Sequence, residues 1–65
     1  MISLYKIENT RIEEDGTYIS AELRGLSTDN KPTETEYGKI DNGSAYVEMD
    51  TKNIYFFDSE SEEWV

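Results

Sequence analysis

The sequence contains no cysteine and no histidine. Thiolate and imidazole groups are the main ligands of structural zinc sites, and imidazole is the side chain most used for acid–base catalysis near neutral pH. The chain therefore has no disulfide framework, no thiol nucleophile and no zinc site of the usual kind. We expect a protein that is not an enzyme, with no catalytic residues, no metal and no cofactor.

Long apolar runs are also missing. A helix that crosses a bilayer needs about 20 apolar residues, and no segment of this chain approaches that length. Residues 1–6 lead into charged side chains rather than into the apolar core of a signal peptide. We expect a soluble protein that stays where it is made and does not associate with a membrane.

Positive charge is scarce. Six Lys and Arg stand against 15 Asp and Glu, which gives a net charge of −9. Such a chain repels phosphate backbones, so we expect no direct binding of nucleic acid. Two interpretations of the negative charge stay open: it keeps a small protein soluble, or it imitates DNA in a basic protein cleft.

The carboxylates do not by themselves indicate a hydrolytic site. A pair of catalytic carboxylates acts across a sizeable cleft, and a chain of 65 residues has little material with which to build one. Asp50 and Asp58 flank a predicted hairpin, where Asp commonly caps a turn. We therefore expect no small-molecule substrate.

The pattern of apolar residues predicts a single all-β domain over residues 1–65. Two antiparallel hairpins form a small sheet or an open barrel, with a C-terminal strand or cap that carries the tryptophan. In the first hairpin, residues 4–24, the turn at Asp15-Gly16 places Ile12 opposite Ile19 and Thr10 opposite Ala21. Period-two alternation puts four residues on one face of this hairpin: Ile12, Ile19, Ala21 and Leu23.

Residues 26–44 form a polar connection rich in turn residues. Thr33, Thr35 and Tyr37 alternate with glutamates, which favours a short strand near residues 33–40. The alternative is a mobile arm, because the segment has little to bury.

The second hairpin lies within residues 45–65. A loop of three residues, 51–53, places Ala45, Val47, Met49, Tyr55 and Phe57 on one face, and this is the register we favour. A loop of two residues instead places Val47 and Met49 with Ile54 and Phe56. Trp64 and Val65 then return beside the hairpin.

Aromatic residues concentrate in this last segment. Adjacent residues of a strand point to opposite faces, so Phe56 and Phe57 make the hairpin apolar on both sides. Either Trp64 folds over Ile54 and Phe56 within the chain, or one face binds a partner. The candidate protein-interaction residues are Tyr46, Ile54, Phe56 and Trp64.

Three elements occur in order near the C-terminus: Asn42-Gly43-Ser44, then the segment 48–58, then Trp64. This stretch resembles the Gly-Ser, Glu-x-Asp-Thr-Gly-Lys-x-Tyr-x-x-Asp and Trp hairpin of structural proteins from tailed bacteriophages. The whole chain is similar to short proteins encoded by phages and prophages of Gram-positive bacteria. It departs from the pattern at Lys52 and Asn53, where the family usually has glycine, and the match covers about a third of the chain.

The resemblance implies a virion-associated structural or decoration protein that acts by protein–protein assembly. Its partners would be further copies of itself, in a homo-oligomer, or other virion proteins. It would be made in the cytoplasm of the host bacterium and incorporated into the particle. The alternative is a small acidic phage accessory protein that binds and modulates a host protein as a nucleic-acid mimic.

Overall fold

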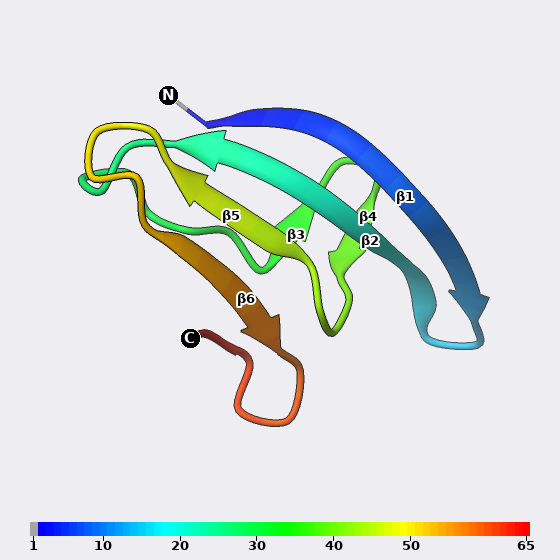
Figure 1. Cartoon of the computed structure of the whole chain (residues 1–65). Helices are drawn as coiled ribbons and strands as arrows, with labels where there is room; N and C mark the ends of the chain where they lie inside the picture. The colour runs from blue at the N-terminus through cyan, green and yellow to red at the C-terminus, as the bar shows by residue number, and fades with distance from the viewer. Residues whose placement is uncertain (1) are drawn as a thin grey trace.

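The computed structural model describes residues 2–65, which form seven strands and no helix (Figure 1). The strands curl into one mixed sheet with the shape of a half-barrel, which confirms the expected all-β class. Both expected hairpins, β1–β2 and β5–β6, are antiparallel. The strand bounds are β1 (Ser3–Glu13), β2 (Gly16–Gly25), β3 (Glu34–Thr35), β4 (Gly38–Ile40), β5 (Ala45–Glu48), β6 (Ile54–Asp58) and β7 (Glu63–Trp64).

Strand β2 is the centre of the sheet. β1 pairs along one edge of β2, and two short parallel strands share the other edge. β4 pairs with Tyr18 and Ile19, whereas β5 pairs with the later part of β2, from Glu22 to Gly25. β3 extends the sheet beyond β4, and β6 followed by β7 extends it beyond β5.

The interruption between β4 and β5 is bridged by the Ser44 side chain. Ser44 is only 2% exposed, and its Oγ accepts a hydrogen bond from the Ala21 N–H (3.1 Å) and donates one to the Ile19 carbonyl (3.3 Å). The Asp41 N–H donates to the same carbonyl at 2.8 Å. A buried backbone group without a hydrogen-bond partner lowers the stability of the fold. These bonds therefore supply partners for the β2 backbone where no strand pairs with it.

The core lies on the concave side of the half-barrel. Period-two alternation along β2 buries Ile19, Ala21 and Leu23, which confirms the face expected for these three residues. Gly25 continues this row, and the Tyr46 hydroxyl occupies the space that a Cβ would need there. The complete buried apolar cluster is Ile19, Ala21, Leu23, Ile40, Tyr46 and Phe57.

The register of the first hairpin differs from the expected one by two residues. Ile12 pairs with Thr17, and Thr10 pairs with Ile19. The turn consists of residues 14–15, and the positive φ of 140° falls on Gly16, after the turn rather than within it. Ile12 stays on the same side as Ile19 but lies beyond the core, where it is 79% exposed.

The polar connection contains two short strands rather than one. β3 and β4 pair as a small antiparallel hairpin, with Thr35 opposite Gly38 and a turn at Glu36 and Tyr37. Residues 26–33, which precede this hairpin, hold no strand.

The favoured register of the second hairpin is wrong. Ala45 pairs with Phe56, and Val47 pairs with Ile54, so these four side chains share a face as in the alternative register. Residues 49–53 connect the two strands, and the connection is closed by bonds from the Glu48 N–H to the Asn53 carbonyl and from the Lys52 N–H to the Glu48 carbonyl. Lys52 adopts the left-handed conformation, with φ of 66°. Glu48, the last residue of β5, lies on the same side as Tyr46 and is buried.

Trp64 returns beside β6, as expected. It pairs with Phe57 in β7, and Val65 exchanges two backbone hydrogen bonds with Phe56.

Replacing Ser44 tests the bridge across the interruption. Ser44→Ala leaves the buried Ala21 N–H without a partner, and we expect it to lower the free energy of unfolding by about 1–3 kcal/mol. Urea denaturation followed by circular dichroism measures the change. Ser59→Ala, at an exposed turn position, is the matched control and should change stability by less than about 0.5 kcal/mol. Equal stability of the two variants would contradict the role of the Ser44 hydroxyl.

Candidate protein-interaction surface

Part of the concave side of the sheet is covered by the chain itself. Residues 26–33 cross it and are held by side chains of the core. The Tyr46 hydroxyl donates to the Leu26 carbonyl (3.1 Å), and the Trp64 indole N–H donates to the Pro32 carbonyl (2.9 Å). The aromatic rings on this side are therefore engaged within the chain.

Lys31 anchors the later part of the crossing segment. Its Nζ lies 2.7 Å from Glu48 Oε2, and it also lies 5.0 Å from the centre of the Tyr46 ring and 4.5 Å from that of Tyr55. Thr51 donates a hydrogen bond to the other Glu48 oxygen at 2.6 Å. Hydrogen bonds from Lys31 and Thr51 hold the pKa of Glu48 below its ordinary value of 4.5, and the bond to Glu48 raises the pKa of Lys31. A buried carboxylate is thus paired with a cation that two ring faces also stabilise.

The opposite, convex side of the second hairpin carries an uncovered apolar surface. Its members come from β5, β6 and the residue after β7, and the strand pairings place them on one face. Ile54, Phe56 and Val65 are 57%, 54% and 67% exposed. We call this surface the outer patch, and it consists of Ala45, Val47, Ile54, Phe56 and Val65.

The four predicted interaction residues divide between the two sides of the sheet. Ile54 and Phe56 lie in the outer patch, whereas Tyr46 is fully buried in the core and has no surface to offer a partner. Trp64 is half-buried and packs edge-on against Tyr46 and Phe57, with ring centres 5.9 and 5.2 Å away. It does not fold over Ile54 and Phe56 as the intrachain interpretation had it, because Trp64 shares the face of Phe57, its strand partner.

A polar rim borders the outer patch on β2. The parallel pairing sets Glu22 beside Ala45 and Arg24 beside Val47 on the same face. Arg24 binds Glu22 at 3.1 Å and stacks 3.6 Å from the centre of the Tyr5 ring. An apolar centre with an adjacent polar rim is the usual composition of a protein–protein interface.

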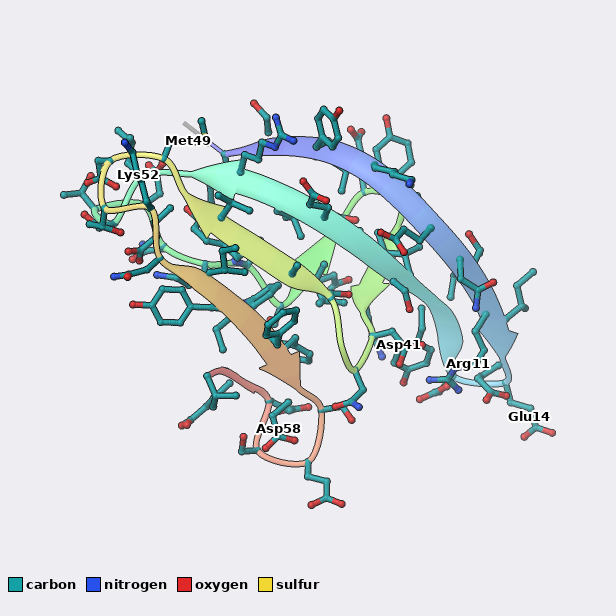
Figure 2. The ribbon with its side chains drawn as sticks, viewed as in Figure 1. Arg11, Glu14, Asp41, Met49, Lys52 and Asp58 are labelled. Atoms are coloured by element: carbon teal, nitrogen blue, oxygen red, sulfur yellow. The ribbon has the colours of Figure 1, made fainter. Side chains whose placement is uncertain are left out.

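Acidic residues gather at one end of the half-barrel. In Figure 2, Arg11, Glu14, Asp41 and Asp58 all lie at this end, opposite the turn that carries Met49 and Lys52. Arg11 forms ion pairs with Glu13 and with Asp41 (3.1 Å), and its hydrogen bond lowers the pKa of Asp41. The end encloses a hollow of about 1000 Å³ in which two cations, Arg11 and Lys39, face six carboxylates. These carboxylates belong to Glu13, Glu14, Asp15, Glu34, Asp41 and Glu62.

No group of three or more Asp or Glu side chains within residues 2–65 has the arrangement of a metal site. Nor does this part of the chain contain a helix that is long and apolar enough to cross a membrane.

Comparison of the chain with protein-family models, with curated proteins and with solved structures gave no match.

Two features of the surface were not found by reasoning from the sequence. Val65 joins the outer patch only through its pairing with Phe56, whereas Val47 shared a face with Ile54 and Phe56 in the alternative register, which was not the favoured one. The Lys31–Glu48 pair joins residues 17 positions apart, and no motif in the sequence marks it. The adjacent Phe56 and Phe57 did indicate that one ring would face outward.

The Lys31–Glu48 pair predicts a dependence of stability on pH. Lys31→Met leaves Glu48 buried without its cation, so we expect it to destabilise the fold at pH 7 more than Lys52→Met, at an exposed turn, does. A carboxylate with a lowered pKa stabilises the fold above its unfolded pKa and loses that contribution as the pH falls through its folded pKa.

The difference in stability between the wild type and Lys31→Met should therefore shrink as the pH falls below about 4.5. Urea denaturation at a series of pH values measures it. A difference that stays constant from pH 7 to pH 3 would contradict the charge pairing.

Proposed function

We propose that this chain is a virion-associated structural or decoration protein of a phage or prophage, and that it acts by assembling with other proteins through the outer patch. The main support for this proposal is that Ile54, Phe56 and Val65 are exposed on one face of the sheet. In so small a domain, rings and branched side chains that could have enlarged the core instead face solvent. A partner that covers them gains their burial, at roughly 25 cal/mol per Å² of apolar surface.

The rest of the surface supports an assembly role over a catalytic one. Two aromatic residues of the concave side, Tyr46 and Trp64, bind the chain's own Leu26, Lys31 and Pro32. The resemblance of the second hairpin to phage structural proteins supplies the phage context. The departure at Lys52 is accommodated, because Lys52 adopts the left-handed conformation that glycine would otherwise supply.

The acidic end supports a second candidate function, that of an accessory protein that binds a basic partner as a nucleic-acid mimic. The six carboxylates around the hollow exceed the two cations there. Binding through this end would weaken steeply as salt rises, whereas binding through the outer patch would change little. The ionic-strength dependence of partner binding thus separates the two functions.

Variants of the outer patch test the proposed assembly. Phe56→Ser removes an exposed ring and should change the monomer's stability by less than about 1 kcal/mol. We expect it to lower the number of copies per particle at least about tenfold, because truncation of a central aromatic residue of an interface lowers the binding affinity by at least that factor. The measurement is quantitative mass spectrometry of gradient-purified particles from bacteria that produce the phage and express the tagged chain.

Tyr37→Ser is the matched control, because Tyr37 is 55% exposed at the distant β3–β4 turn. It should leave the number of copies per particle unchanged. Absence of the wild-type chain from the particles, or equal incorporation of both variants, would overturn the proposal.

A further inference from the structure

The long strand β1 has a free edge. Within residues 2–65, β1 pairs only with β2, so the backbone groups along its other edge have no strand partner. Such an edge is a template for the addition of another strand. Near it, Ile7 and Ile12 are 39% and 79% exposed, on the side of the sheet that faces the core.

β1 differs from the rest of the chain in charge. Its two cations, Lys6 and Arg11, balance its two carboxylates, Glu8 and Glu13, so the net charge of −9 lies entirely outside the strand. Two molecules that repel each other elsewhere can therefore approach through β1. The charges also alternate in sign along the strand, so that an antiparallel copy can set its Glu13 against Lys6.

Two bulges set the faces of β1. The register with β2 shifts between Leu4 and Lys6 and between Ile7 and Asn9, which leaves Tyr5 and Glu8 as the extra residues. The pairings with β2 place Ile7, Thr10 and Ile12 on the core side of the sheet. They place Lys6, Asn9, Arg11 and Glu13 on the convex side.

We propose that two copies of this chain associate through antiparallel pairing of their β1 strands about a two-fold axis at Thr10. With Glu8 bulged, this register sets Asn9 against Arg11, Ile7 against Ile12 and Lys6 against Glu13 of the other copy. Every one of these pairs joins residues of the same face, as antiparallel pairing requires. Each apolar pair and each ion pair occurs twice, and two half-barrels merge into one continuous sheet.

The bulges contribute selectivity to this pairing. Bulges and charges on an edge strand normally discourage indiscriminate pairing. Here the bulge at Glu8 supplies the one-residue offset without which Ile7 and Ile12, or Lys6 and Glu13, would fall on opposite faces. The edge therefore accepts a second β1 in one register and disfavours strands of unrelated sequence.

Charge exchange between Lys6 and Glu13 tests the register. K6E alone, or E13K alone, sets two like-charged pairs across the axis, and we expect each variant to dissociate at least about tenfold more readily than the wild type. A mixture of K6E and E13K chains restores two opposite-charge pairs and should form a heterodimer. Sedimentation equilibrium over a range of concentrations measures the association.

K52E and E60K are the matched controls, since they make the same charge changes at exposed turns away from β1. They should dimerise like the wild type, as should Phe56→Ser, because the outer patch lies on the other side of β2. Loss of dimerisation in Phe56→Ser alone would assign self-association to the outer patch and overturn pairing through β1. A wild-type chain that stays monomeric at millimolar concentration, or a dimer that K6E and E13K leave unchanged, would also overturn it.

A cysteine at the axis gives an independent measurement. The chain has no cysteine of its own, and Thr10 faces Thr10 of the other copy in the proposed register. Thr10→Cys should form a disulfide-linked dimer on mild oxidation, whereas Ser61→Cys, at an exposed turn, should cross-link far more slowly. Equal rates of cross-linking at the two positions would contradict an axis at Thr10.

Discussion

The fold depends on the backbone hydrogen bonds of β2 at one place along its edge, the gap between β4 and β5, where no strand pairs with it. Without a partner at the gap between β4 and β5, the buried backbone of Ala21 would lose a hydrogen bond next to the core. The hydroxyl of Ser44 replaces the missing strand there. Because the gap is bridged, two short strands can lie in succession along β2 and each can continue into its own hairpin.

The crossing segment, residues 26–33, gives the half-barrel its closed side. It consists of polar and turn residues with almost nothing apolar to bury, yet its carbonyl groups and its lysine meet the hydroxyl, the indole and the carboxylate of the core. The aromatic residues thus serve as hydrogen-bond donors and as ring faces for a cation as well as apolar mass. Their polar groups also explain how a core with few aliphatic side chains holds a single arrangement.

The sequence was informative wherever the signal was local. Alternation along β2 identified Ile19, Ala21 and Leu23, and the turn residues identified both hairpins and the return of Trp64. Register was less accessible, because it depends on which residue of a turn takes a positive φ: Gly16 rather than Asp15 in one hairpin, Lys52 in the other. The parallel pairs of β2 and the Lys31–Glu48 contact join distant segments, and no local pattern encodes them. For the candidate surface, Ile54 and Phe56 could be predicted from the sequence. The burial of Tyr46 and the place of Val65 in the outer patch could be found only once the pairing of the strands was known.

Phe56 and Phe57 are identical neighbours under different constraints. Phe57 is surrounded by this chain, so any substitute must fit the space left by Tyr46 and Trp64. Phe56 faces outward, and nothing within the described chain restricts its shape to that degree. In evolution, the residue at 57 would be held by the protein's own interior, while the residue at 56 would be free to change together with whatever surface it meets.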